Sequence, residues 1–212
     1  EDIRDFDVRV KRFLAGANPT YVCELKIDGF KIILTYEQGK LVTAATRGNG
    51  RVGENVTANV RTIESVPLKL EEEVDIVVEG EIWLAKKNFE QLNKERQRAG
   101  EEVYANPRNV AAGTIRQLDP RMVAARKLDS FIYDLALLRQ GSAGQARLPS
   151  TQQDELKLLR QLGFKVNPEW KHCPTINEVI KYWQHWHKHR DNLPYNLDGV
   201  VVKVNEIEYQ ER

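Results

Sequence analysis

The stretch Tyr21-Val-Cys-Glu-Leu-Lys-Ile-Asp-Gly29 alternates between apolar and polar residues, which is typical of a β-strand with two different faces. The apolar face would consist of Tyr21, Cys23, Leu25 and Ile27. The opposite face would carry Glu24, Lys26 and Asp28. An acid-base-acid row of this kind fits either a solvated sheet edge or the wall of a site that holds a nucleophilic lysine. The pattern alone leaves both interpretations open.

Further strands and helices are expected on both sides of this stretch. Strands are predicted near residues 21–28, 30–37, 40–46, 74–84, 130–138 and 198–204, the last of them buried. Helices are predicted at 1–14, 85–99, 151–162 and 176–190, and one more is opened by Pro107. Asn18-Pro19 should end the first helix, Glu37-Gln38-Gly39-Lys40 should form a hairpin turn, and 139–149 should be a surface loop. A capping box, Thr175-x-x-Glu178, should open the last helix.

These elements favour an α+β fold of mainly antiparallel sheets flanked by helices, because strands come in runs and helices lie between the runs. The 212 residues fit one large domain or two small ones, and the net charge of +1 neither demands nor excludes nucleic acid. Apolar runs stay below the ~18 residues that a membrane span needs. Cys23 and Cys173 are interpreted as two reduced thiols and not as a disulfide or a metal site.

Several motifs in a fixed order resemble the adenylation domain of bacterial NAD-dependent DNA ligases. Lys26-Ile-Asp-Gly29 resembles the first motif of the covalent nucleotidyltransferases, Glu79-Gly-Glu-Ile82 the third and Asp198-Gly-Val-Val-Val-Lys203 the fourth; Phe131-Ile-Tyr133 resembles a motif between them. The segments Thr46–Ile63 and Ala105–Pro120 are more specific. The second contains Asn-Pro-Arg-Asn, which ATP-dependent ligases and capping enzymes lack, and it therefore indicates the NAD-dependent branch.

The resemblance implies an ATP-grasp-like nucleotidyltransferase fold and a three-step reaction. Lys26 would attack the α-phosphate of NAD and release nicotinamide mononucleotide. The AMP would pass to the 5′-phosphate of a DNA nick, and the 3′-hydroxyl would then displace it and seal the strand. NAD would be the AMP donor, Mg²⁺ the metal, and nicked double-stranded DNA the partner of a cytoplasmic, nucleoid-associated bacterial monomer without membrane contact.

The same resemblance implies roles for particular residues. Glu24 would contact adenine, with Tyr133 stacked on one side of the ring and Val201 on the other. Arg47 and Glu81 would hold the ribose, and Lys203 would be the cation that helps to lower the pKa of Lys26. Phosphate of the nucleotide or of the nick would meet three arginines: Arg108, Arg116 and Arg190. No residue is expected to bind metal directly.

Two further patterns are interpreted as structural. Gly48-x-Gly50-x-x-Gly53 matches a dinucleotide fingerprint, but no apolar crossover helix of a βαβ unit follows it, so the glycines should shape a loop. His185 and His189 share a helix face, but no acidic or cysteine partner accompanies them, which favours a solvated face over a metal site. The alternatives for the whole chain are another polynucleotide ligase, such as an RNA ligase, and a non-catalytic nucleotide-binding module.

The sequence also departs from the family pattern. Phe30 replaces a usual leucine and is followed by Lys31, Asn49 and Asn55 replace acids, and Glu79 replaces an arginine. Because the chain begins at Glu1 and ends soon after Lys203, residues 1–212 are expected to be a single adenylation-domain fragment. The expected missing parts are the module for nicotinamide mononucleotide, the last lysine motif, and the OB, zinc, helix-hairpin-helix and BRCT domains, so any Zn²⁺ would lie there. Such a fragment should not seal nicks unaided.

Overall fold

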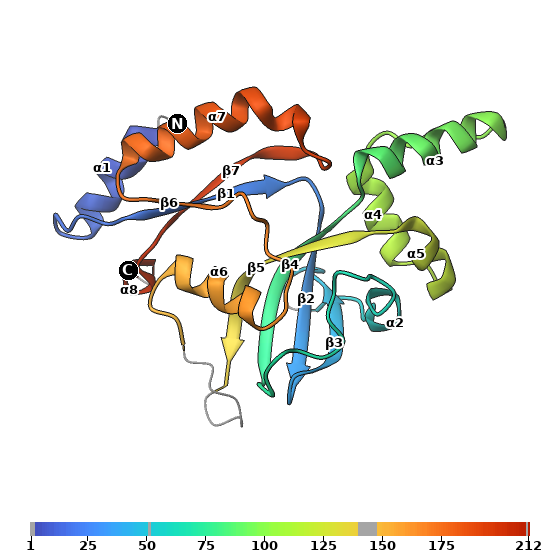
Figure 1. Cartoon of the computed structure of the whole chain (residues 1–212), viewed down its shortest axis with the longest axis horizontal. Coiled ribbons are helices and arrows are strands. Elements are labelled where there is room, and N and C mark those ends of the chain that lie inside the picture. The colour runs from blue at the N-terminus through green and yellow to red at the C-terminus, as the bar shows by residue number, and fades with distance from the viewer. Residues whose placement is uncertain (1–2, 51, 140–147, 211) are drawn as a thin grey trace.

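A computed structural model describes residues 3–50, 52–139, 148–210 and 212, and within them two antiparallel sheets lie one above the other (Figure 1). The larger sheet has the order β3-β2-β4-β5 and the smaller sheet the order β6-β1-β7. The strands are β1 (Tyr21–Ile27), β2 (Phe30–Glu37), β3 (Lys40–Thr46), β4 (Ile76–Trp83), β5 (Asp129–Leu138), β6 (Lys171–Cys173) and β7 (Leu197–Val204). Only Asp28 and Gly29 separate β1 from β2, so the chain passes directly from one sheet to the other.

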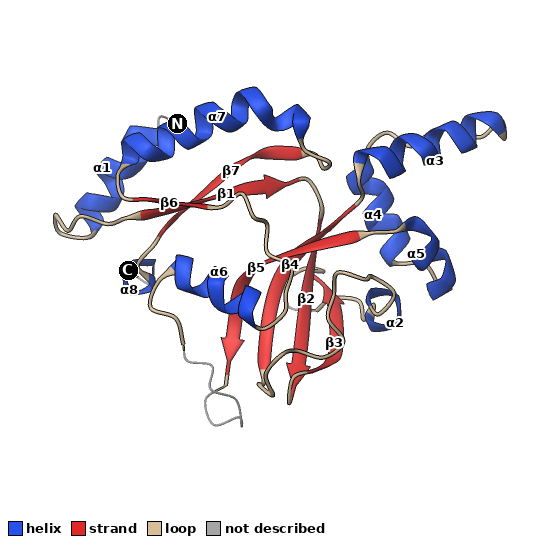
Figure 2. Cartoon of the chain, in the orientation of Figure 1, coloured by secondary structure: helices blue, strands red, loops and turns tan. Residues whose placement is uncertain are grey.

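Helices flank both sheets (Figure 2). They are α1 (Ile3–Phe13), α2 (Thr57–Val60), α3 (Lys86–Arg98), α4 (Pro107–Ile115), α5 (Pro120–Arg126), α6 (Gln152–Gln161), α7 (Ile176–His189) and α8 (Ile207–Gln210), with a short 3-10 turn η1 (Arg190–Asn192). Helices α1 and α7 lie along the smaller sheet, α6 lies against β5, and α3, α4 and α5 gather at one end of the larger sheet. The predicted α+β class with antiparallel sheets is confirmed.

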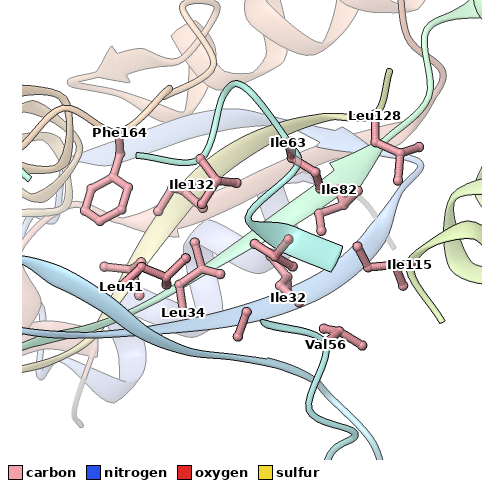
Figure 3. Packing of buried hydrophobic residues seen from close by; sticks show 14 of the residues in the cluster. Ile32, Leu34, Leu41, Val56, Ile63, Ile82, Ile115, Leu128, Ile132 and Phe164 are labelled. Carbon is pink, nitrogen blue, oxygen red and sulfur yellow. The ribbon is translucent and has the colours of Figure 1, made fainter. Parts of the chain in front are cut away.

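The main hydrophobic core lies on one face of the larger sheet (Figure 3). Alternate residues of β2 and β4, such as Ile32, Leu34 and Ile82, point into it and are fully buried. Ile115 of α4 and Phe164, which follows α6, close the core from the helix side. Burial of side chains of this size is worth ~1.5–3 kcal/mol each, so this core holds the larger sheet rigid beneath the smaller one.

A second core lies between β1 and helix α7. It contains the apolar face predicted for the first strand: Tyr21, Cys23, Leu25 and Ile27. Trp83 and Phe131, from the ends of β4 and β5, belong to it and stack at a centroid distance of 5.2 Å. Tyr195 packs edge-on against both rings, so an aromatic cluster joins the larger sheet to the smaller one.

Several sequence-based predictions are confirmed and some are corrected. The predicted 198–204 strand exists, but none of its residues is buried, because β7 is the outer strand of the smaller sheet. The first helix ends at Phe13, ahead of the predicted breaker Asn18-Pro19, because Ala15 and Gly16 take positive φ angles just after it. Helix α7 follows Thr175, yet Thr175 makes no side-chain cap bond. Most of the predicted 139–149 loop lies outside the described residues.

Short elements were not predicted: α2, α5, β6, η1 and α8. Within the described part of the chain, no helix has the length and apolar character needed to cross a bilayer.

Candidate functional site

A cavity of about 170 Å³ lies between the two sheets. Its lining comes from β1 and β7 of the smaller sheet and from β4 and β5 of the larger one: Glu24, Leu25, Lys26, Ile27, Glu81, Tyr133, Val201 and Lys203. A hollow of about 530 Å³ near Thr62 and Lys165 is larger, so volume alone does not single out this cavity. Six of the residues chosen from the sequence meet here: Glu24, Lys26, Glu81, Tyr133, Val201 and Lys203.

The lysine of the first motif is displayed by strand alternation. Leu25 and Ile27 turn into the second core, so Lys26 points the other way, into the cavity, and its side chain is 53% exposed. Glu24, on the same face, is nearly buried because Lys203 covers it from β7. The predicted division of the first strand into an apolar and a polar face is thus confirmed, and Glu24 and Lys26 of the polar face line the cavity, whereas Asp28 follows β1 and does not.

The charged partner of Lys26 is Asp198. Strands β1 and β7 pair antiparallel with Lys26 opposite Gly199, which brings the adjacent Asp198 within reach. Lys26 Nζ donates a hydrogen bond of 2.7 Å to Asp198 Oδ2. The side chains are 53% and 36% exposed, so the pair lies at the cavity mouth in contact with solvent. Any nucleophilic use of this amine must therefore begin with removal of a proton beside a carboxylate.

Lys203 is held by acids. Its Nζ lies 3.3 Å from Glu24 Oε1 and 3.3 Å from Asp134 Oδ1. Burial acts to lower the pKa of Lys203, but Glu24, Asp134 and Glu155 outweigh this and raise it, so the group stays a cation. No contact between Lys203 and Lys26 is present among the described residues, and the idea that Lys203 activates Lys26 remains a prediction.

Two cavity carboxylates have unsatisfied acceptors. Glu24 Oε1 and Glu81 Oε2 are buried without a hydrogen-bond donor within the described part of the protein. The 3.3 Å contact of Glu24 with Lys203 is an ion pair without hydrogen-bond geometry. Burial raises the pKa of Glu24, and it raises the pKa of Glu81 to about 7 against the opposing effects of nearby cations, Arg108 first. Because buried acceptors are normally satisfied, Glu81 Oε2, and Glu24 Oε1 beside its ion pair with Lys203, are free to accept a hydrogen bond from water or from a bound ligand.

Flat and apolar surfaces complete the cavity. Val201 stands opposite Glu24 in the β1–β7 pairing. Tyr133, half-buried on β5, lies beneath Lys203, whose Nζ is 5.7 Å from the ring centroid. The cavity thus combines hydrocarbon, an aromatic face and unsatisfied acceptors, a combination suited to a flat heterocycle with amino or hydroxyl donors.

The predicted arginines surround the cavity but do not line it. Arg108 lies 3.8 Å from Asp28 at the entrance, and Arg116 lies 2.6 Å from Glu54. Arg190 lines a neighbouring hollow of about 160 Å³ that also includes Asp198. Arg47 is exposed just after β3 and is not among the lining residues. The structure therefore leaves the predicted ribose contact of Arg47 untested.

The described glycines of this segment, Gly48, Gly50 and Gly53, come directly after β3, and no βαβ crossover follows them in the described part of the chain. Thr46 and Glu54 exchange hydrogen bonds across the base of this segment, from Thr46 N to Glu54 O at 3.0 Å and from Glu54 N to Thr46 Oγ1 at 3.0 Å. A Cβ on Gly53 would stand 1.8 Å from Thr46 O, and one on Gly48 would stand 1.8 Å from Val52 O. Close backbone approach therefore explains two of the glycines, as the sequence interpretation anticipated.

A comparison with known families covers the whole chain. The sequence model described as "NAD-dependent DNA ligase adenylation domain" matches residues 1–212. The chain belongs to this family.

Curated relatives include a DNA ligase of Halalkalibacterium halodurans, 49% identical over 212 residues, and one of Bacillus cytotoxicus, 46% identical over 211 residues. The alignments cover the whole of this chain but 31% of each relative, so the chain spans about a third of their length.

Among solved structures, "mycobacterial DNA ligase D complexed with ATP and MES" superposes with a TM-score of 0.50 at 17% identity, over 88% of this chain and 49% of that one. This likeness concerns the fold alone. The two-sheet arrangement is thus shared with that structure.

The departures from the adenylation-domain pattern have structural explanations. Lys31 and Glu79, both unusual for the family, form an ion pair with each other on adjacent strands β2 and β4. Asn49 Oδ1 accepts from Val52 N within the glycine loop. Asn55 Oδ1 accepts from Thr57 N and Oγ1 just before α2. The charges of Lys31 and Glu79 therefore balance each other, and the two asparagines are satisfied by local hydrogen bonds.

Residues that the sequence reasoning missed in this adenylation domain are Asp134, Glu155 and the role of Asp198. Glu155 lies buried on α6 and accepts a hydrogen bond of 2.9 Å from Leu135 N. Asp134 directly follows Tyr133, and Asp198 opens the fourth motif, so their neighbours could have pointed to them. Glu155 stands in an ordinary amphipathic helix, and no local signal marks it.

Proposed function

We propose that this chain is the adenylating unit of an NAD-dependent DNA ligase and that Lys26 is its nucleophile. The observation that carries the proposal is the cavity in which Lys26 faces two buried carboxylates with unsatisfied acceptors. Glu24 would accept from the amino group of adenine, and Glu81 from a ribose hydroxyl. Tyr133 and Val201 would enclose the ring, and Arg47 would approach the ribose from its loop.

The first step forms one bond and breaks another. The Lys26 nitrogen bonds to the α-phosphorus of NAD, the phosphorus–oxygen bond to nicotinamide mononucleotide breaks, and that nucleotide leaves as a phosphate monoester. The Lys26 ammonium loses two protons on becoming a phosphoramidate: one would pass to Asp198, which already lies 2.7 Å from Nζ, and the other to the phosphate of the leaving nucleotide or to water. Lys203, Arg108, Arg116 and Arg190 would balance the charge of phosphates during transfer.

The remaining steps rest on the same residues and on nicked double-stranded DNA as partner. The AMP would pass to the 5′-phosphate and then leave as the 3′-hydroxyl attacks. Mg²⁺ would supply further charge neutralisation. It would bind mainly through substrate phosphates and water, as Mg²⁺ commonly does. Among the described residues no group of three or more acids, histidines or cysteines could hold a metal.

We propose further that residues 1–212 act as one adenylation domain, in a monomeric cytoplasmic protein associated with the nucleoid. The relatives are DNA ligases of bacteria, which supports a bacterial origin.

Intact-mass spectrometry tests the nucleophile directly. The natural full-length protein that contains this chain, incubated with NAD and Mg²⁺, should gain the mass of one AMP. Its Lys26→Ala variant should not. Lys94→Ala, which removes an exposed lysine on α3, is the matched control and should form the adduct normally. An adduct with ATP but not with NAD would contradict the NAD-dependent assignment, and binding of AMP without any adduct would favour a non-catalytic module.

A further inference from the structure

Arg116 is held on two sides by side chains from distant parts of the chain. It follows α4, whose end lies beside the start of β2 (Figure 1). Its Nε donates to Glu54 Oε2 at 2.6 Å, and its guanidinium carbon lies 4.9 Å from the centroid of the Phe30 ring. The guanidinium therefore has an aromatic face on one side and a carboxylate at its edge.

The two contacts differ in how easily they can be exchanged. Phe30 opens β2, pairs with Ile82 in the larger sheet and packs against the main core, so its ring is fixed. The Glu54 side chain is 63% exposed and that of Arg116 is 47% exposed. Ion pairs exposed to this degree contribute little net free energy, so another anion can replace the carboxylate without disturbing the fold.

Two hydrogen bonds to Thr46 across the base of the glycine loop hold the backbone of Glu54 in place. Only the carboxylate can swing away. A phosphate presents the same pattern of oxygen acceptors to the arginine guanidinium and carries more negative charge. It would therefore displace the Glu54 carboxylate from Arg116 on binding.

We propose that Phe30 is a positioning residue that presents Arg116 to a phosphate, and that Glu54 occupies the guanidinium until this phosphate replaces it. The inference rests on the proposed function and explains why an aromatic ring stands where the family usually has leucine. The phosphate can belong to the nick or to the nucleotide, and the two sources are separated by experiment.

The test compares three variants of the protein as encoded: F30L, F30Y and E54Q. One arm measures affinity for nicked DNA with and without a 5′-phosphate, and the other measures affinity for NAD. Loss of the aromatic face in F30L should weaken phosphate-dependent binding about two- to five-fold, as expected for an exposed cation–π contact. F30Y keeps the ring and should bind like the unmodified protein.

E54Q should change binding in the opposite direction. Removal of the competing charge should tighten binding of the same phosphate, most at low ionic strength, because salt screens the exposed carboxylate. If F30L and E54Q change the affinity for 5′-phosphorylated nicked DNA in opposite directions, the phosphate belongs to the nick. If they do so for NAD, it belongs to the nucleotide. Since the Glu54 side chain is exposed, E54Q keeps the proposal testable even if F30L folds poorly.

The inference is overturned if F30L and E54Q shift affinity in the same direction, or if neither shifts it in either arm. Formation of the Lys26 adduct, measured in each protein, separates this failure from that of the proposed function. If the unmodified protein forms no adduct, the proposed function is refuted. If adducts form normally but F30L and E54Q do not change the affinity in opposite directions, only the roles of Phe30 and Glu54 are refuted.

Discussion

Lys26 and Asp198 stand 172 residues apart in the sequence, yet their side chains meet at 2.7 Å across neighbouring strands. The contact follows from the register of β1 and β7, which places Gly199 opposite Lys26. Gly199 presents no side chain between the two groups, so the carboxylate reaches the amine directly. If Lys26 is the nucleophile, as proposed, Asp198 is the acceptor best placed to take a proton from it.

Replacing Asp198 with asparagine should therefore slow adduct formation far more than it weakens NAD binding. Loss of a positioned proton acceptor typically costs about 100-fold or more in rate. Single-turnover adenylation at several NAD concentrations separates the rate constant from the affinity. Asp5→Asn, an exposed replacement of the same chemistry on α1, should leave both unchanged. An equal rate in Asp198→Asn would refute the proton-acceptor role.

Glu81→Gln should change how stability depends on pH. The pKa of Glu81 is about 7 in the folded protein, above its ordinary value of 4.5. Between these values the folded state binds more protons than the unfolded state, so the Glu81 contribution destabilises the protein increasingly as pH rises from 4.5 to 7.

The glutamine variant should escape this loss and become the more stable protein at pH 8, by up to roughly 3 kcal/mol at ~1.4 kcal/mol per pKa unit. Urea unfolding across this pH range measures the difference. Glu155, whose pKa is also about 7, acts in both proteins and cancels in the comparison. Parallel pH profiles of the two proteins would contradict the prediction.

Gly53→Ala should destabilise the loop that holds Glu54. Its new Cβ would stand 1.8 Å from Thr46 O, so the paired backbones of Thr46 and Glu54 must separate. We expect a loss of about 1–3 kcal/mol in the free energy of unfolding. Gly113→Ala is the matched control: nothing lies within 4 Å of its Cβ, and alanine favours its helix by about 1 kcal/mol. Opposite shifts in melting temperature are expected, and equal shifts would contradict this account.

Both cysteines should resist alkylation in the native protein. Cys23 and Cys173 are buried free thiols with their sulfurs 3.7 Å apart, and burial raises the pKa of each. Since the thiolate is the reactive form, a thiol reagent should label neither at neutral pH and both after denaturation. Rapid labelling of either native thiol, followed by mass spectrometry, would show that the second core opens readily.

The first strand and its motif could be predicted because a period of two is a local property of sequence. Its neighbour β6 could not, because Lys171–Cys173 has only three residues and becomes a strand by pairing with β1. The capping box Thr175-x-x-Glu178 predicted the start of α7 correctly, but the Thr175 side chain makes no capping hydrogen bond. The Glu178 carboxylate lies 3.8 Å from Lys171 Nζ instead.

The placement of six site residues in one cavity followed from motif order. Their electrostatics did not. The action of Lys203 on Lys26 stays a prediction, and the sequence did not reveal that Glu24, Asp134 and Glu155 raise the pKa of Lys203. Glu155 comes from a helix that no motif marks, and the partner of Lys26 lies on a strand near the other end of the chain. Contacts of this kind depend on how the sheets are stacked, which sequence periodicity does not encode.

The smaller sheet is assembled from both ends of the chain, and the whole larger sheet is inserted between them. The contact of Cys23 with Cys173 closes a loop of 150 residues, whereas β2 and β3 are joined by a tight turn. Loop-closure entropy favours the short connection first, so we expect the larger sheet to form early and β1 to find its two neighbours late. The strand that carries Lys26 would then acquire its final shape near the end of folding, and a newly made chain could not complete the cavity between the sheets before β7 has been synthesised.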